Sequence, residues 1–277
     1  MKKFIKLFTI AALTAAITAT AAALSACNTN DEKTIKIGAS PAPHAEILKE
    51  VVKPELEKQG YKLEVVEFND YVLPNTAVEN GDLDANYFQH NLYLEDFNAT
   101  RKTHLKAVAQ VHYDPFGIYR GSYTSGALSD LPEGSKVLVP NDGTNEARAL
   151  YLLQKEGLIT LKEGITSSTA KKTDIESNPK NLDIVELEAA QVPVSLRDGA
   201  IGVINGNYAI QHGLKIADAI AAEESNDENI SQYVNVVAVK EGTENSEKIQ
   251  ALVKVILSDA VKTYVQQHYN GAVLTVS

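Results

Sequence analysis

Residues 84–93 read DANYFQHNLY, a pattern that predicts a buried strand running directly into the first turn of a helix. Successive side chains of a strand point to opposite faces of the sheet. We therefore expect Phe88 and His90 on one face, and Tyr87 and Gln89 on the other. An aromatic ring and an imidazole would then lie together at the point where the strand ends.

The helix predicted after this strand can be capped by His90 or Asn91, and it would carry Tyr93 and Phe97. The phenol of Tyr93 in the first turn joins the Phe88 ring and the His90 imidazole. The three side chains together are typical of one wall of a ligand-binding site. The same residues also fit a hydrophobic core with a hydrogen-bonded turn histidine, because aromatic side chains are commonly buried. The rest of the chain distinguishes between these two interpretations, a ligand-binding wall and a hydrophobic core.

Strands and helices alternate along the rest of the chain, which favours mainly parallel sheets covered on both faces. Two such α/β units are separated by extended segments near residues 116 and 235. The pattern predicts two lobes joined by two crossing strands, with a cleft between them. The first lobe would comprise residues 34–115 plus 235–277, and the second residues 116–234. Expected strands cover 34–39, 62–68, 85–90, 105–111, 136–140, 182–187, 200–204 and 233–239, and one long helix is expected over 246–267.

The amino terminus has the pattern of a lipoprotein signal. A basic segment at 2–6 precedes an apolar segment at 7–23, and Leu-Ser-Ala-Cys at 24–27 matches a lipobox. Residues 1–26 would be removed and Cys27 would carry the lipid, with 27–33 as a tether. The alternatives are an ordinary signal peptide and an uncleaved anchor, which would be short for a bilayer crossing.

Composition excludes several classes of function. Cys27 is the single cysteine, so the exported part would have no disulfide and no thiol catalysis. Loss of three lysines with the signal takes the net charge from −10 to −13. An acidic chain argues against binding to nucleic acid and against electrostatic docking on anionic lipid. Membrane attachment would therefore depend on the lipid chains.

Polar residues follow several of the predicted strands, where ligands of open parallel sheets bind. Tyr71 follows the second strand and Asn205 follows the strand at 200–204. With Thr144 as the expected N-cap, Arg148 lies one turn into a helix, where its guanidinium can bind a carboxylate through two parallel hydrogen bonds. The alternatives are a turn asparagine at 205 and a surface arginine paired with Glu146 or another exposed acid.

Several motifs resemble the methionine-binding lipoproteins of the MetQ/NlpA type, which are the solute receptors of methionine ABC importers. The motifs are FNDYVLPN at 68–75, DANYFQH at 84–90, PNDGTNEARAL at 140–150 and VINGNYA at 203–209. They occur in the right order and span nearly the whole mature chain.

The resemblance implies a two-lobed fold like that of periplasmic binding proteins, with L-methionine in the cleft. It also implies a monomer, lipid-anchored to the extracytoplasmic face of the cell membrane, that works with a permease and an ATPase. D-methionine, a methionine dipeptide or another apolar amino acid are alternative ligands. The implied ligand contacts are Tyr71, Phe88, His90 and Tyr93 around the side chain, with Arg148 at the carboxylate and Asn145 and Asn205 among the polar contacts.

Two other classes of function lack support in the sequence. A hydrolase needs a nucleophile beside a base, and no nucleophile-elbow pattern is present. A metal-ion receptor could use His44, His90, His104 or His112, but these residues form no short-spaced ligand cluster. We therefore predict no enzyme activity, no cofactor and no metal.

The anchoring prediction can be tested with Cys27→Ser. This variant should fold and be exported but should leave the membrane fraction, because the acidic mature chain offers no other means of attachment. Fractionation after a high-salt wash measures the outcome. Retention of Cys27→Ser in the membrane would contradict the lipoprotein prediction.

Overall fold

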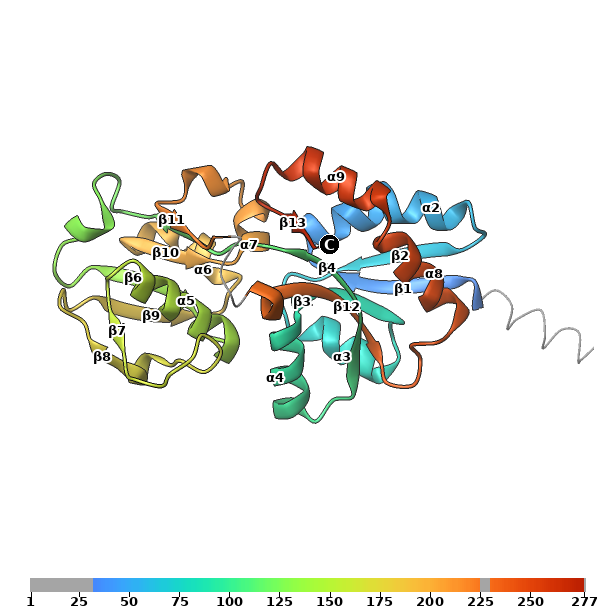
Figure 1. The fold of residues 1–277 in the computed structure, drawn as a ribbon, viewed down its shortest axis with the longest axis horizontal. Coiled ribbons are helices and arrows are strands. Elements are labelled where there is room, and N and C mark those ends of the chain that lie inside the picture. Colours follow the sequence, from blue (N-terminus) through green and yellow to red (C-terminus); the bar gives the residue numbers. More distant parts are fainter. Residues whose placement is uncertain (1–31, 225–229, 277) are drawn as a thin grey trace, which may run out of the picture.

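The computed structural model describes residues 32–224 and 230–276, which form two α/β lobes lying side by side along the long axis of the molecule (Figure 1). Each lobe is built on its own sheet. In the first lobe the strand order is β13-β4-β12-β3-β1-β2, and in the second it is β11-β5-β10-β6-β9. A two-stranded ribbon, β7-β8, adds to the second lobe. The predicted α/β, two-lobed fold is confirmed, while the predicted lobe limits stay a prediction.

Most of the longer strands and helices lie where the hydrophobic pattern predicted them. The strands are β1 (Thr34–Ala39), β2 (Lys62–Glu67), β3 (Ala85–His90), β4 (Leu105–Tyr113), β5 (Gly117–Arg120), β6 (Lys136–Pro140), β7 (Thr160–Leu161), β8 (Ile175–Ser177), β9 (Asp183–Leu187), β10 (Ile201–Ile204), β11 (Ala221–Ala222), β12 (Val234–Lys240) and β13 (Leu274–Thr275). The helices are α2 (Lys53–Glu57), α3 (Leu73–Asn80), α4 (Asn91–Arg101), α5 (Gly143–Lys155), α6 (Gln191–Val194), α7 (Gly206–Gln211), α8 (Glu247–Ile256) and α9 (Asp259–Tyr269). Short helical turns are η1 (Pro41–Ala45), η2 (Leu48–Val52), η3 (Leu128–Asp130), η4 (Lys172–Asp174), η5 (Leu196–Asp198), η6 (Ile216–Asp218) and η7 (Ile230–Tyr233).

Both large sheets are mixed, so the expectation of mainly parallel sheets is wrong. Strand β1 runs parallel to β2 and β3, but β12 runs antiparallel to both β3 and β4. The reason is the double crossing, because β4 leads the chain out of the first lobe and β12 brings it back in the opposite direction. In the second lobe β5 likewise pairs antiparallel with β10.

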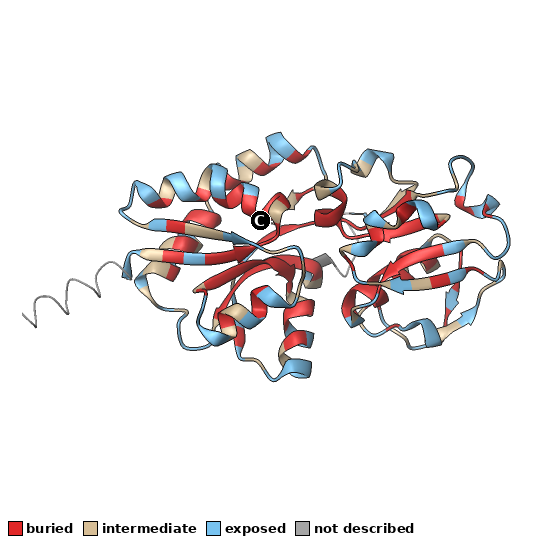
Figure 2. Cartoon of the chain, turned by 180° about the vertical axis from the view of Figure 1, so that it is seen from behind, coloured by how far each residue is buried: buried red, intermediate tan, exposed pale blue. Residues whose placement is uncertain are grey.

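The first-lobe core lies on both faces of its sheet, which explains the continuous apolar run of β12. Val237 and Val239 pack on the face covered by η2, α8 and α9, whereas Val236 and Ala238 pack on the face covered by α3 and α4 (Figure 1). Strands buried on both faces lack the alternation of half-exposed ones. Figure 2 shows the same arrangement, with the strands buried and the outer helical faces exposed.

Strand β3 departs from the predicted alternation. Consecutive residues of β12 oppose Tyr87 and Gln89, so Phe88 has no partner and the ladder contains a bulge. The Gln89 side chain therefore bonds to Asn75 of α3, while Tyr87 points to the opposite face and contacts His112. The expectation that Tyr87 and Gln89 share a face is wrong, because one extra residue shifts every later side chain.

The predicted helix over 246–267 is also wrong in one respect, because it is two helices. Helix α8 ends at Ile256, and Ser258 has the extended backbone of the residue before a helix. Serine competes with helical hydrogen bonds and is favoured at such starts. Pro54 lies in the first turn of α2 just after η2, a position where its missing N–H costs no helical hydrogen bond.

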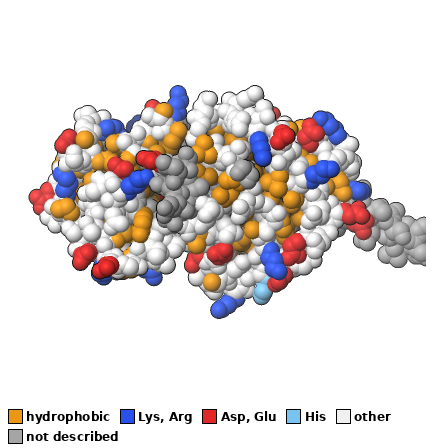
Figure 3. Space-filling model, viewed as in Figure 1, with side chains coloured by type: hydrophobic (Ala, Val, Ile, Leu, Met, Phe, Trp, Pro, Cys, Tyr) orange, Lys and Arg blue, Asp and Glu red, His pale blue; other side chains and the backbone are white. Residues whose placement is uncertain are grey.

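On the face shown in Figure 3, acidic and basic side chains are interspersed over both lobes, as on a solvated surface. None of the helices in the described ranges has the length and apolar character needed to cross a bilayer. The predicted signal at 1–26 and lipid attachment at Cys27 lie outside the described residues.

A matched pair of leucines tests the packing of α8. Leu252 is fully buried and Leu257 is 41% exposed. Leu252→Ala should lower the free energy of unfolding by about 2–5 kcal/mol, because it leaves a cavity, whereas Leu257→Ala should change it by less than about 0.5 kcal/mol. Urea unfolding measures both, and equal losses would contradict the core assigned here.

Candidate ligand-binding site

A cavity between the lobes is lined by every residue that the sequence predicted as a ligand contact. The lining comes from the ends of β2, β3 and β10, from α4 and α5, and from both crossing segments. This is the edge at which strand ends were expected to meet. The predicted residues are Tyr71, Phe88, His90, Tyr93, Asn145, Arg148 and Asn205, and the lining also includes Gln89, Asp114, Phe116, Gly206, Asn207 and Asn235.

Aromatic rings form one end of the cavity. The Tyr71 ring lies 5.7 Å from the centroids of both Phe88 and Tyr93 and stacks on Tyr208 of the second lobe at 4.9 Å. Its hydroxyl donates to Asn207 Oδ1 at 2.6 Å, so the ring also links the lobes. Offset and edge-on rings of this kind give an apolar surface of fixed shape.

His90 joins the two lobes through both ring nitrogens. Its Nδ1 accepts from the Tyr93 backbone N–H at 3.0 Å and caps α4, as the sequence predicted. The proton therefore sits on Nε2, which donates to Asn145 Oδ1 of α5 at 3.2 Å. Burial, with Arg148 nearby, lowers the pKa of His90 to about 3, so the ring is neutral.

Helix α5 begins earlier than expected. Asp142, and not Thr144, is the N-cap: its carboxylate accepts from the Asn145 backbone N–H at 3.1 Å and from Asn145 Nδ2 at 2.8 Å. An aspartate cap also benefits from the positive helix end. Arg148 consequently lies in the second turn, away from the free N–H groups, and the predicted position beside them is wrong.

Arg148 is buried, and hydrogen bonds engage the Nε and Nη2 atoms of its guanidinium. Its Nε and Nη2 donate to the Glu223 carboxylate at 2.8 and 2.6 Å, and Nη2 also donates to the Asp114 carbonyl at 2.9 Å. The guanidinium lies 4.0 Å from the Phe116 ring centroid and 4.4 Å from that of Tyr233. Burial alone would lower the pKa of Arg148, but the Glu223 carboxylate raises it above its ordinary value. The alternative of a surface arginine paired with an exposed acid is wrong.

Two amide groups of the second lobe face the cavity with unused hydrogen-bonding capacity. Both Asn205 and Asn207 are buried. Among the residues that the structure describes, neither Asn205 Oδ1 nor Asn207 Nδ2 has a hydrogen-bond partner. Buried polar atoms are rarely left unpaired, because each costs about 1–3 kcal/mol. One acceptor and one donor are thus available to a bound molecule.

The sequence pattern of the NlpA lipoprotein family matches residues 35–277, which is nearly the whole of the described chain. The chain belongs to this family. Membership places it among substrate-binding receptors and not among enzymes.

Relatives of this NlpA-family chain are similar over most of their length. The methionine-binding lipoprotein MetQ of Bacillus subtilis is 39% identical, with 93% of this chain and 95% of that protein covered. The D-methionine-binding lipoprotein MetQ of Escherichia coli is 41% identical, with 87% and 88% covered.

Solved structures agree with the fold. A nutrient-binding protein from Burkholderia cenocepacia, bound to methionine, is 40% identical and has a TM-score of 0.82, with 88% of this chain and 100% of that chain covered. A lipoprotein from Ruminococcus gnavus is 54% identical and has a TM-score of 0.85, with the same shares covered.

Sequence reasoning missed several residues of the site. Asp114 directly follows β4 and Asn235 lies near the start of β12, two strands at whose ends the sequence analysis placed no ligand contact. Glu223 lies in a polar segment that the sequence presents only as a loop. Asn207 could have been predicted from the sequence, because it belongs to the same Asn-Gly-Asn turn as Asn205.

The depressed pKa of His90 predicts a loss of stability in acid. Below pH 6.5 the unfolded chain takes up a proton that folded His90, with a pKa of about 3, cannot accept. Stability is therefore full above pH 6.5 and falls as the pH approaches 3, by about 2 kcal/mol at pH 5 from this group.

Urea unfolding of His90→Gln at pH 7 and pH 5 measures this contribution. The stability difference between the two pH values should shrink by about 2 kcal/mol relative to the unsubstituted protein. His104→Gln, which alters an exposed histidine, should keep the original difference. An unchanged pH dependence in His90→Gln would refute the assignment.

Proposed function

We propose that this NlpA-family chain is the lipid-anchored receptor of an ABC importer and that it binds methionine in the cavity between its lobes. The observation that carries the proposal is the cavity lining, which is aromatic at one end and bears groups for an amino-acid head at the other. The similarity to a methionine-binding and a D-methionine-binding lipoprotein supports the same ligand.

The polar end suits a zwitterion. The hydrogen bonds of Arg148 to Glu223 and Asp114 use Nε and Nη2, and we assign Nη1 to the ligand carboxylate together with Asn207 Nδ2. Asn205 Oδ1 would accept from the α-ammonium group. Hydrogen bonds to charged groups contribute about 1.5–3 kcal/mol each.

The aromatic end suits a thioether. Phe88, Tyr71 and Tyr93 surround this part of the cavity, and His90 closes it as a neutral ring. A sulfur atom beside aromatic rings gains about 0.3–1.5 kcal/mol per contact. A charged side chain would lose its hydration there without finding a partner.

The cavity lining favours an apolar side chain without distinguishing one apolar amino acid from another. A methionine dipeptide would need more room than a single amino acid. D-methionine and other apolar amino acids remain the alternative ligands that titration separates.

The receptor cycle would be one of hinge closure. Hydrogen bonds that bridge the lobes include His90 to Asn145, Tyr71 to Asn207, and Tyr208 to the Asn69 carbonyl. Opening the lobes would break them and expose the ligand, as in other hinge-closing receptors. Lipid on Cys27 would hold the monomer at the extracytoplasmic face, where permease and ATPase receive the ligand.

Calorimetric titration of the ligand-stripped, detergent-solubilised protein tests the function. Methionine should bind at least about 30-fold more tightly than glutamate or lysine, since burying an unpaired charge costs about 2 kcal/mol or more. D-methionine and a methionine dipeptide in the same series define the preferred ligand. Equal affinity for glutamate or lysine would contradict methionine as the ligand.

Methionine amide then tests the polar end of the site. Arg148→Gln combined with Glu223→Gln removes both charges of the pair and should cost about 2–5 kcal/mol for methionine, but little for the amide. Phe88→Ala should weaken both ligands alike, by about 1–3 kcal/mol. Glu223→Gln alone is the control and should still distinguish methionine from its amide. If the double variant does so equally well, Arg148 does not bind the carboxylate.

A further inference from the structure

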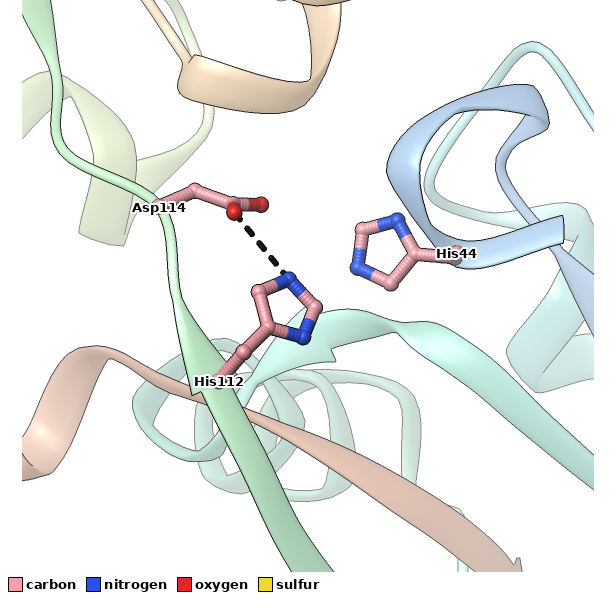
Figure 4. A group of neighbouring side chains, drawn as sticks. All are labelled: His44, His112 and Asp114. Carbon is pink, nitrogen blue, oxygen red and sulfur yellow. Dashed lines mark ion pairs between the residues drawn. The ribbon is translucent and has the colours of Figure 1, made fainter. Parts of the chain in front are cut away.

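Two histidines and an aspartate converge behind the ligand cavity. His44 lies in η1, His112 lies near the end of β4, and Asp114 lies in the first crossing segment. All three are buried. Figure 4 shows one nitrogen of each imidazole and the Asp114 carboxylate turned toward a common point. The fold brings together residues whose sequence spacing gave no metal signal.

The spacing of these groups matches neighbouring ligands of one metal ion. Each residue offers one ligand atom, and the three atoms lie within 4.8 Å of one another. His112 Nε2 lies 3.0 Å from Asp114 Oδ1 (Figure 4). Ligand atoms bound at about 2.1 Å from one metal ion lie about 3.0–3.4 Å apart when their bonds meet at 90–109°. Side-chain shifts of less than about 1 Å would close the set.

An outer group holds the His112 ring in place. The Tyr87 hydroxyl contacts His112 Nδ1, so a proton on that nitrogen leaves the Nε2 lone pair directed at the cluster. Metal-binding histidines generally have their second nitrogen fixed in this way. Asn235 Oδ1 lies 3.1 Å from His44 Nε2 and adds a carbonyl oxygen from the second crossing segment.

The cluster also contains unsatisfied atoms. Within the described part of the chain, His112 Nε2 and Asp114 Oδ1 have no hydrogen-bond partner, because their mutual contact lacks the direction of a hydrogen bond. A cation at the common point would satisfy all of these groups.

We propose that His44, His112 and Asp114 bind a divalent transition-metal ion, with Asn235 Oδ1 as a fourth ligand. Two imidazole nitrogens with two oxygens are a donor set suited to zinc. The ion would tie η1 to both segments that cross between the lobes. Asp114 and Asn235 also line the ligand cavity, but neither is among the amino-acid contacts assigned above, and occupancy of the metal site does not require methionine to be the ligand.

Zinc titration of the chelator-stripped, detergent-solubilised full chain tests the proposal. One zinc ion per chain should bind, and Asp114→Asn should weaken binding at least tenfold while keeping the side-chain volume. Tyr87→Phe removes only the outer hydroxyl and should weaken zinc binding about 10–100-fold. His104→Ala is the matched control, because its side chain is 65% exposed and outside the cluster, and it should bind zinc unchanged.

Cobalt(II) gives a second readout that depends on the ligands themselves. Visible absorption of the cobalt-loaded protein should show the intense bands of a low-coordinate nitrogen and oxygen site, and Asp114→Asn should lose them. The proposal is overturned if the unsubstituted protein binds no zinc, or if Asp114→Asn and Tyr87→Phe both bind zinc as tightly as it does. Should Asp114→Asn fail to fold, the Tyr87→Phe comparison decides alone.

Discussion

The burial of one guanidinium organises the centre of this molecule. A buried cation is tolerable only when partners surround it, because leaving it unpaired costs several kcal/mol. Arg148 of α5 obtains its partners from segments far along the chain: the Glu223 carboxylate lies 75 residues away and the Asp114 carbonyl belongs to the first crossing. The Tyr233 ring, just before β12, covers one side of it. One side chain thereby fixes α5 against both segments that join the lobes.

The contacts across the cavity are few enough to fit the proposed opening of the lobes. The lobes meet there through hydrogen bonds between side chains, such as His90 to Asn145, and through the stacked rings of Tyr71 and Tyr208. Each such bond contributes about 0.5–1.5 kcal/mol, so a ligand that bridges the lobes would shift the balance between open and closed forms. The buried clusters on the two faces of each sheet need not change during this motion.

The sequence predicted much of this because the governing signals are local. Apolar runs located every strand of five or more residues in the described ranges, and polar residues at strand ends indicated the edge where the cavity lies, since parallel strands end at one edge. The features that the sequence did not predict depend on a choice between similar local options, or on contacts between residues far apart in the chain. Asp142 and Thr144 are both good caps, and only the fold selects Asp142. The bulge at Phe88 follows from pairing with β12, which no local pattern of β3 records. The partner of Arg148 lies in a segment without periodicity.

The cluster of His44, His112 and Asp114 involves the same two segments that cross between the lobes. Asp114 and Asn235 line the ligand cavity and also belong to the group formed with His44 and His112. A cation held there would therefore act on the very segments that must bend when the lobes separate. Because coupling between two binding sites is reciprocal, a metal that favours the closed arrangement would raise ligand affinity by the same factor by which the ligand raises metal affinity. The crossing segments would then carry this coupling directly, without a longer path through either core.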